Sequence, residues 1–504
     1  MDAPNRSAIV PAMKKPSIDL SRVALKRRRT KIVATVGPSS AAEEILRELV
    51  TAGVNVFRLN FSHGSHESHG ELYARIRKVA EEEDRHVAIL ADLCGPKIRV
   101  GRFEDGAITL AQGERVRISV TATRGRPGLI PSEYTALVSD AEPGDRILLD
   151  DGNLELRVVS VEETELSCEV IQGGLLKDRK GMNLPGVAVS APALTEKDKA
   201  DAHFAAGLGV DYMALSFVRA SADIEALRAH LAEVSAEIPI IAKIEKPEAL
   251  EVISAILDEA DGVMVARGDL GVEMPAEEVP LIQKELIRLA IHANKPVIVA
   301  TQMLDSMIEN PRPTRAEVTD VAAAAWAGAD AVMLSGETAS GAFPVRAVET
   351  MDRVLRKVEG YEWKRGQFDG LVSHRAFTRA ETPVVDRLDE AISRATSQLS
   401  RELMVRTIAT PVISGKTARM VSAERPAAPV LALTSRVEAC RRLALFWGVL
   451  PVVADVSDLD TLRETVRREA RERGLAEPGE PILLVWNAGR GSARRAPTIS
   501  ILEA

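Results

Sequence analysis

The chain contains 504 residues, of which 46% are hydrophobic and 27% charged, a composition typical of a multidomain globular protein rather than a fibrous or disordered one. Its 65 basic and 73 acidic residues give a formal net charge of −8, which argues against nucleic acid as a partner, because nucleic-acid-binding proteins carry a basic face. The three cysteines are widely spaced, and no apolar run reaches the ~18 residues of a membrane span or forms a signal peptide. We therefore expect a protein of a reducing compartment, the cytoplasm, with no membrane partner.

Eight short apolar runs, rich in β-branched residues and followed in most cases by a helical stretch, dominate the first two thirds of the chain. They are Lys31–Val36, Val54–Leu59, Val87–Leu93, Tyr212–Phe217, Pro239–Ile244, Gly262–Ala266, Pro296–Ala300 and Ala331–Leu334. Runs that are apolar on both faces are typical of parallel strands covered by helices. Eight such units predict an α/β fold, a (β/α)8 TIM barrel.

The alternation of apolar runs and helical stretches stops after the third run. Segments with alternating polar and apolar residues follow instead, at Arg115–Val120, Arg146–Leu149, Leu154–Val161 and Glu165–Gln172. They predict a small β-barrel domain inserted in a loop at the top of the barrel. Because the mouth of such a barrel carries the active site, we expect this insertion to act as a lid.

A smaller alternation of strands and helices returns near the C-terminus, with a helix around Leu388–Leu403 and a strand at Val430–Leu433. It predicts an open α/β domain with a regulatory or assembly role. The predicted limits are 1–25 for an N-terminal arm, 26–95 and 192–356 for the barrel, 96–191 for the lid, 357–382 for a polar connector and 383–504 for the C-terminal domain.

Polar and charged residues follow the predicted barrel strands, where the carboxyl ends of parallel strands meet at one mouth. They are Arg58, Asn60, Asp92, Ser216, Lys243, Glu245, Arg267, Asp269, Thr301, Gln302, Ser335 and Glu337. Individual members have structural alternatives, such as an ion pair between Lys243 and Glu245 or a helix cap at Asp269. Agreement among so many strand ends favours a catalytic site.

The residue types at this mouth suit metal-assisted chemistry on an anion. Glu245 and Asp269 supply two carboxylates from adjacent strands, a set that Mg²⁺ prefers. Lys243 projects to the same face as Glu245, where it can neutralise charge on a phosphoryl group or an enolate. Arg58 provides a fork-shaped phosphate ligand. The chain lacks a P-loop motif, so this chemistry would not follow the P-loop pattern.

Six segments resemble, in the right order, the motifs of the pyruvate kinase family. They are Thr30–Ser40, Arg58–Gly64, Ile241–Glu245, Ala266–Gly271, Ala300–Met303 and Leu334–Ala339. The resemblance covers nearly all of the chain. It implies transfer of phosphate from phosphoenolpyruvate to ADP, yielding pyruvate and ATP, with Mg²⁺ or Mn²⁺ as cofactor, in a homotetramer. It also implies the architecture outlined above.

The resemblance further implies roles for individual residues. Lys243 would stabilise the transferring phosphoryl group and the enolate, while Arg58 would bind the substrate phosphate. Glu245 and Asp269 would bind the divalent metal, and the main chain of Gly268 and Asp269, with Thr301, would bind the substrate carboxylate. Thr301 and Ser335 would deliver a proton. The nucleotide would contact Asn60, His63, Arg99 and Lys180, and a monovalent cation would bind Asn60, Ser62, Asp92 and the carbonyl of Leu93.

Two departures from the family pattern carry predictions of their own. Lys97 stands where most studied members have Glu, and Leu93 stands where they have Thr. The exchange at residue 97 is either a neutral surface change or a fixed positive charge that takes over the role of K⁺ toward Asp92 and the substrate phosphate. We expect K⁺ to be dispensable.

The second departure lies in the C-terminal domain. Apolar Val412 and Ile413 replace the polar residues that hold fructose 1,6-bisphosphate in some members. Ser414, Lys416 and Thr417, with Arg490 or Arg494, suit another phosphorylated effector, AMP or a sugar monophosphate. The basic segment around Arg490 is equally compatible with a solvated loop.

Two other functions remain open at this stage. One is a Mg²⁺-dependent carbon–carbon lyase that handles enolpyruvate on a barrel, and the other is a catalytically silent paralogue that binds metabolites. The nucleotide contacts implied for Lys180 and for Asn60–His63 argue against the lyase. The intact catalytic positions argue against the paralogue.

Overall fold

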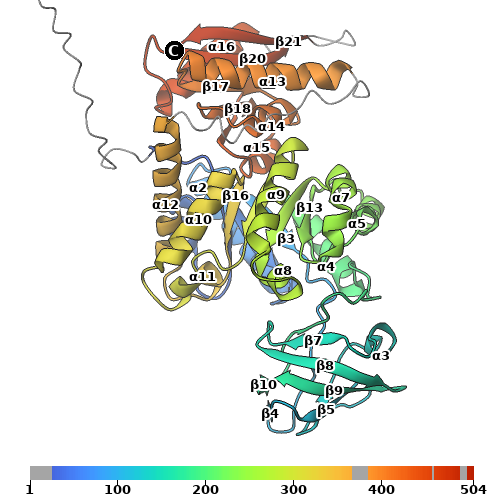
Figure 1. The fold of residues 1–504 in the computed structure, drawn as a ribbon. Coiled ribbons are helices and arrows are strands. Elements are labelled where there is room, and N and C mark those ends of the chain that lie inside the picture. Colours follow the sequence, from blue (N-terminus) through green and yellow to red (C-terminus); the bar gives the residue numbers. More distant parts are fainter. Residues whose placement is uncertain (1–24, 366–383, 457–458, 489–495) are drawn as a thin grey trace, which may run out of the picture.

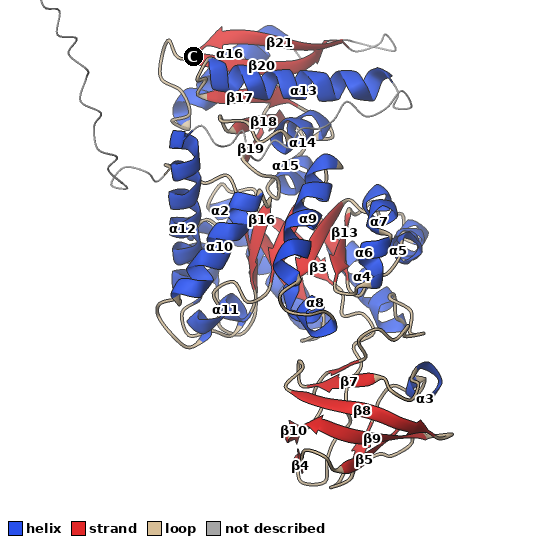
Figure 2. Cartoon of the chain, in the orientation of Figure 1, coloured by secondary structure: helices blue, strands red, loops and turns tan. Residues whose placement is uncertain are grey.

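The computed structural model describes residues 25–365, 384–456, 459–488 and 496–504. They form a central barrel, a small β insertion at one end of it and an α/β domain at the opposite end (Figure 1). Figure 2 shows strands enclosed by helices in the barrel, whereas the insertion is made of strands and loops with the one short helix α3. Within these residues, none of the helices has the length and apolar character needed to cross a membrane.

The eight predicted runs form one closed barrel in which every neighbouring pair of strands is parallel, in the order β1-β16-β15-β14-β13-β12-β3-β2. The strands are β1 (Lys31–Thr35), β2 (Val56–Asn60), β3 (Ala88–Asp92), β12 (Tyr212–Leu215), β13 (Ile240–Ile244), β14 (Gly262–Ala266), β15 (Val297–Ala300) and β16 (Ala331–Leu334). The predicted fold class is confirmed.

Helices cover the outside of the barrel. They are α1 (Glu43–Ala52), α2 (His66–Glu82), α4 (Glu196–Leu208), α5 (Ser221–Glu233), α6 (Glu248–Glu251), α7 (Ile253–Glu259), α8 (Arg267–Glu273), α9 (Val279–His292), the 3₁₀ helix η1 (Asp305–Ile308), α10 (Arg315–Ala327), α11 (Gly336–Ala339) and α12 (Pro344–Arg365). α12 continues into the segment predicted as a polar connector. The rest of that segment lies mainly outside the described residues.

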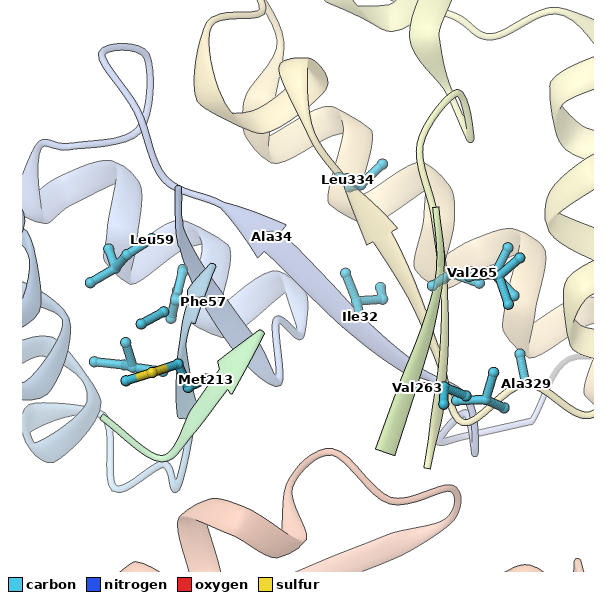
Figure 3. Packing of buried hydrophobic residues seen from close by; sticks show 14 of the residues in the cluster. Ile32, Ala34, Phe57, Leu59, Met213, Val263, Val265, Ala329 and Leu334 are labelled. Carbon is cyan, nitrogen blue, oxygen red and sulfur yellow. The ribbon is translucent and has the colours of Figure 1, made fainter. Parts of the chain in front are cut away.

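The alternation of side chains along each strand builds two separate cores. Outward residues such as Phe57, Leu59 and Val263 are fully buried against the helices, as Figure 3 shows. Inward residues, among them Val33 and Met264, fill the interior of the barrel. Leu445 of the C-terminal domain belongs to this inner cluster, so the amino ends of the strands face that domain and the carboxyl ends face the insertion.

The insertion has its own hydrophobic core and contains two sheets, with strand orders β10-β4 and β11-β7-β8-β9-β5-β6. Its elements are β4 (Ala107–Leu110), β5 (Arg115–Ser119), β6 (Leu129–Pro131), α3 (Leu137–Asp140), β7 (Arg146–Leu149), β8 (Leu154–Val161), β9 (Glu165–Gln172), β10 (Gly174–Lys177) and β11 (Met182–Asn183). Four of these strands follow the predicted segments.

The C-terminal domain is a five-stranded sheet in the order β19-β18-β17-β20-β21, parallel except for β21. Its elements are α13 (Val384–Glu402), β17 (Thr407–Pro411), α14 (Lys416–Ala423), β18 (Val430–Thr434), α15 (Val437–Leu443), β19 (Val449–Val453), α16 (Leu459–Glu472), β20 (Pro481–Ala488) and β21 (Ala496–Glu503). Arg490 and Arg494, expected to bind a phosphate, lie outside the described residues.

Candidate active site

A buried cluster of opposite charges occupies the carboxyl ends of β2, β3 and β13. The Lys243 ammonium lies 3.0 Å from Glu245 Oε1 and 3.3 Å from Asp92 Oδ1, and it donates a 2.6 Å hydrogen bond to Ser216 Oγ. Arg58 Nε donates to Asp92 Oδ2 at 2.6 Å. The structure thus brings together five of the predicted residues from four strand ends, namely Lys243 and Glu245 at β13, Asp92 at β3, Ser216 at β12 and Arg58 at β2.

The charges in this cluster fix one another's protonation states. Burial alone would lower the pKa of Lys243, but the carboxylates of Asp92 and Glu245 raise it above its ordinary value. Burial would raise the pKa of Asp92, yet Lys243 and Arg58 hold that pKa below its ordinary value. Lys243 is therefore a permanent cation at neutral pH, which is the state needed to stabilise negative charge.

The backbone around Phe217 fixes the second oxygen of Glu245. Phe217 N donates to Glu245 Oε2 at 2.7 Å, and Phe217 itself has a left-handed conformation with φ 55°. Gly95 passes so close that a Cβ atom there would lie 2.7 Å from the Phe217 ring and 2.9 Å from Ser216 Cβ. Gly95 also has φ 68°, so both space and conformation require glycine at this point.

The donor set at the mouth fits a divalent metal. Burial and the nearby Asp269 raise the pKa of Glu245 even though Lys243 lowers it, so a further cation beside the two carboxylates would favour their charged forms. Among the residues that the structure describes, no group of three or more His, Cys, Asp or Glu side chains could share a metal. An ion here would complete its shell with water and substrate oxygens, as Mg²⁺ does.

Thr301 and Gly268 meet at the ends of β15 and β14. Gly268 N donates to Thr301 Oγ1 at 2.8 Å, and Thr301 has φ 68°. Arg267 holds this turn, because its guanidinium donates to the Thr301 carbonyl at 2.5 Å and to Asp320 at 2.6 Å. The strand-end pattern singled out Arg267 without giving it a role; the structure makes it a positioning residue. Ser335 Oγ is buried and finds no hydrogen-bond partner in the described part of the chain.

The predicted nucleotide residues lie on both sides of the space between barrel and insertion. Asn60 Oδ1 accepts a bond from Ser62 N at 3.2 Å, which shapes the loop that carries His63. Partial burial and the charges of Arg99, Lys97 and Arg58 lower the pKa of His63, so the barrel loop and the cations of the insertion are close in space.

Lys180 and Arg99 belong to neighbouring segments of the insertion. Arg99 donates to the Arg179 carbonyl at 3.1 Å, and the Lys180 ammonium lies 2.7 Å from Asp150. Both cations are at least partly exposed, so they remain accessible to a ligand.

Lys97 is exposed and lines a cleft between the insertion and the barrel, together with Asp269 and Lys246. Where Lys97 could take over the role of K⁺ toward Asp92, the structure places Arg58 and Lys243 against that carboxylate. The Leu93 carbonyl, expected in a cation pocket, accepts the Ser216 hydroxyl at 2.7 Å. Two members of the predicted cation pocket, Asp92 and the Leu93 carbonyl, thus already have protein partners.

Sequence reasoning missed a polar link between the barrel and the insertion. Lys246 Nζ donates to Glu273 at 2.7 Å, and Asn183 of β11 donates to the same oxygen at 3.0 Å. Arg219 holds the returning segment of the insertion through its bond to the Ala191 carbonyl at 2.8 Å. The partners lie far apart in the sequence. The one local signal is that Lys246 directly follows Glu245, which places it near the predicted metal site.

The fold and the site define a class of protein: a (β/α)8-barrel phosphotransferase whose mouth combines fixed cations with two carboxylates. Comparison with known proteins narrows this class. The model of the pyruvate kinase barrel domain matches residues 27–348, and that of the pyruvate kinase alpha/beta domain matches residues 390–502. The chain belongs to the pyruvate kinase family.

Individual relatives agree with this assignment. The chain is 47% identical over 468 residues to a pyruvate kinase of Geobacillus stearothermophilus, covering 92% of this chain and 78% of the relative. It is also 47% identical to a pyruvate kinase of Corynebacterium glutamicum over 465 residues, 92% and 95% of the two chains. A crystal structure of a pyruvate kinase from Cryptosporidium parvum aligns with a TM-score of 0.87 at 36% identity, covering 94% and 96%.

Membership of the family identifies the chain as a phosphotransferase that uses phosphoenolpyruvate and ADP, rather than a lyase or a silent paralogue. Family members generally depend on a divalent metal and on K⁺, and they are typically oligomeric.

Proposed function

We propose that the Lys243 cluster carries out phosphoryl transfer from phosphoenolpyruvate to ADP. The observation that supports this role is the burial of a permanently charged ammonium between Asp92, Glu245 and Ser216. As the phosphoryl group leaves, negative charge grows on its oxygens and on the enolate of the future pyruvate. A fixed cation in a buried site stabilises that charge without solvent reorganisation.

Glu245 and Asp269 would hold Mg²⁺, or Mn²⁺ in its place. Burial and the charge of Asp269 raise the pKa of Glu245, and a bound divalent ion would offset the repulsion between the two carboxylates. The bound ion supplies Lewis-acid stabilisation of phosphate and enolate oxygens. Arg58, held in place by Asp92, binds and orients the substrate phosphate.

The turn formed by Gly268 and Thr301 would bind the substrate carboxylate through main-chain amides at the start of α8. Thr301 and Ser335 lie at the ends of neighbouring strands, and their hydroxyls are suited to hold and pass a proton to the enolate. The buried Ser335 hydroxyl lacks a protein partner among the described residues, which fits a group that bonds to water or substrate. Protonation of the enolate then yields pyruvate and draws the reaction toward ATP.

The nucleotide would bind between the barrel and the insertion, with Asn60 and His63 on one side and Arg99 and Lys180 on the other. Closure of the insertion excludes water from the enolate. The link between Asn183 and Glu273 supports this role because it already joins the insertion to the helix that carries Asp269.

We further propose that K⁺ is dispensable. Two cations, Arg58 and Lys243, lie against Asp92 of the pocket of Asn60, Ser62, Asp92 and the Leu93 carbonyl expected from the family, and the charge of Lys97 acts on the neighbouring loop at His63. Asp92 is already neutralised by Arg58 and Lys243, and Lys97 adds charge at the cleft. A further monovalent cation would meet repulsion there.

Assembly, regulation and location complete the proposal. We propose a cytoplasmic homotetramer with the domain limits given in the sequence analysis. A phosphorylated effector, AMP or a sugar monophosphate, would bind at Ser414, Lys416 and Thr417 near the start of α14. Lys416 now pairs with Asp389 at 3.2 Å, a pair that a phosphate would compete with.

A coupled assay on the purified chain tests the proposed reaction. We expect pyruvate and ATP to form in equal amounts, and only when phosphoenolpyruvate, ADP and a divalent metal are all present. Pyruvate formation that does not need ADP would overturn the proposal in favour of the lyase.

A further inference from the structure

We propose that His69 is a positioning residue for the nucleotide, because its buried ring fixes the loop that carries His63 through one hydrogen bond and one stacking contact. The inference rests on the nucleotide contacts proposed above for Asn60 and His63. The loop consists of residues 61–65, which join the end of β2 to the start of α2, and His69 lies near the start of that helix. His69 is outside the Arg58–Gly64 motif and has no role in the site described so far.

The first contact is a hydrogen bond from the His69 ring to the main chain of the loop. His69 Nε2 lies 2.8 Å from the His63 carbonyl oxygen, and since a carbonyl can only accept, Nε2 carries the proton. His69 Nδ1 is buried without a hydrogen-bond partner in the described residues. Burial lowers the pKa of His69 even though this bond raises it, so the ring is neutral at neutral pH and directs its single N–H at His63.

The second contact is a stack on Phe61. The rings of Phe61 and His69 have centroids 4.3 Å apart and an interplanar angle of 25°. Phe61 is buried, its N donates to the Asp92 carbonyl at 3.0 Å, and its own carbonyl accepts a bond from Lys197 at 2.8 Å. The His69 ring therefore rests on the part of the loop that is already fixed to the barrel.

The main chain passes directly over the His69 ring after His63. Gly64 has φ 81°, and a Cβ atom built on it would lie 3.0 Å from Ser68 Oγ and 3.3 Å from His69 Nε2. Glycine at this point lets the loop come within reach of the His69 donor. The position of the His63 main chain is thus set by α2.

The side chain of His63, in contrast, is exposed and faces the cations of the insertion. Partial burial and the charges of Arg99 and Lys97 lower its pKa. An exposed ring loses freedom when it contacts a ligand, and a main chain that is already held reduces that loss. His69 itself is buried, so it would act on the nucleotide only through His63.

The expected consequence is a loss of ADP affinity when the donor is removed. His69→Phe keeps a ring for the stack but has no N–H, and it should weaken ADP by about tenfold, the effect of one hydrogen bond on an equilibrium constant. Isothermal titration of the full chain with ADP and Mg²⁺, without phosphoenolpyruvate, measures this directly. In steady-state kinetics the KM for ADP should rise, while kcat and the KM for phosphoenolpyruvate should change less than about twofold.

Two amide variants separate the donor from the size and polarity of the side chain. The amide nitrogen of Gln is as many bonds from Cβ as Nε2 of His, whereas that of Asn corresponds to Nδ1. His69→Gln should therefore recover most of the lost affinity, and His69→Asn should bind ADP as weakly as His69→Phe. The melting temperature of each variant checks its folding, and if His69→Phe does not fold, the comparison of Gln with Asn still decides the result.

A double substitution tests whether His69 acts through His63. His63→Ala removes the ring that contacts the nucleotide, so adding His69→Phe to it should weaken ADP little further. The proposal is overturned if His69→Phe binds ADP like the unmodified chain, if Gln and Asn are equivalent, if the two losses add, or if the affinities for ADP and phosphoenolpyruvate fall equally. A different result, normal ADP affinity in His63→Ala, would show that the proposed nucleotide contact of His63 is itself wrong, and this inference would fall with it.

Discussion

The two ends of the barrel both bury ionic groups, but they treat them differently. At the amino end, Asp330 accepts two bonds from Arg425, at 2.9 and 3.2 Å, and further bonds from Trp447 N and Val297 N. Each oxygen of that carboxylate therefore has two protein donors. At the carboxyl end, the Ser335 hydroxyl has no partner within the described residues, and burial together with the charge of Asp269 raises the pKa of Glu245.

This difference distinguishes a structural contact between domains, the Arg425–Asp330 pair (called the joint below), from a site built for chemistry. Buried polar groups in proteins are normally paired, because an unpaired one costs free energy. At the amino end, both oxygens of Asp330 are satisfied within the protein, and these bonds hold the barrel to the C-terminal domain, although Arg425 Nε is buried without a hydrogen-bond partner in the described residues. At the carboxyl end, the Ser335 hydroxyl is left without a protein partner in the described residues and is free to bond to water or substrate, which is where chemistry is expected.

The largest effect should come from the metal. Removing divalent ions with a chelator should lower the rate at least ~1000-fold, because Glu245 and Asp269 are arranged around a cation. Glu245→Gln and Asp269→Asn should each raise the Mg²⁺ concentration needed for half-maximal rate by about tenfold or more. Titrating initial rate against Mg²⁺ measures this, with Glu285→Gln, an exposed residue of α9, as the control. Unchanged metal dependence in both variants would place the metal elsewhere.

A substitution in the Arg425–Asp330 pair should change the free energy of unfolding rather than the catalytic rate. Arg425→Met removes the buried partner of Asp330 and should lower the free energy of unfolding by about 3–5 kcal/mol, while kcat at low temperature changes little. Urea unfolding measures the loss. Arg288→Met, which removes an exposed ion pair with Glu285, should cost less than ~1 kcal/mol. Equal losses in the two variants would show that the joint is not a special feature.

The dependence of the rate on K⁺ tests whether the protein's own cations at the mouth of the barrel replace a bound monovalent cation. At saturating Mg²⁺ in tetramethylammonium buffer, we expect KCl at matched ionic strength to change the rate less than about twofold, since Lys97 and the cations on Asp92 already supply the charge. Lys97→Glu should create a dependence on K⁺, in part only, because Leu93 remains. Stimulation of the unmodified chain by tenfold or more would refute the proposal.

A smaller effect concerns pH and the amino end. Lys31 is fully buried and donates to the Val449 carbonyl at 2.6 Å, and burial with the neighbouring Arg28 and Arg29 lowers its pKa to about 7. Between pH 7 and about 10.4 the unfolded chain then binds a proton at Lys31 that the folded chain lacks, so this residue makes stability rise with pH. Below pH 7 its contribution is constant.

Lys31→Met should remove that contribution. We expect a flatter dependence of the melting temperature on pH from 7 to 10 in the variant than in the unmodified chain. Lys284→Met, which changes an exposed lysine of α9, serves as the control. Parallel curves for Lys31→Met and the unmodified chain would mean that Lys31 stays charged in the folded protein.

The barrel could be predicted from the sequence because its strands are eight apolar runs that recur with helices between most of them, and the carboxyl end of each run marks the mouth. It did not reveal β6, three residues that end in Pro131, nor β21, an antiparallel edge strand interrupted near its start by Pro497. A short or proline-containing strand gives little periodic signal.

At the mouth of the barrel, too, some features could be predicted from the sequence and others could not. Lys243 and Glu245 could be predicted to share a face from their spacing alone. The hydrogen bond from Arg267 to the Thr301 carbonyl joins residues 34 positions apart. The bond from Asn183 to Glu273 joins residues 90 positions apart. Such contacts depend on how the barrel closes and where the insertion rests, so no local pattern encodes them.

The most direct test of the account is the turnover of Lys243→Met beside its affinity for phosphoenolpyruvate. If Lys243 stabilises charge that develops only during transfer, kcat should fall by about three orders of magnitude or more, while binding of phosphoenolpyruvate, measured by fluorescence titration with Mg²⁺ present, changes far less. A variant that keeps a tenth of the kcat of the unmodified chain, or one that loses rate only through substrate affinity, would contradict the account.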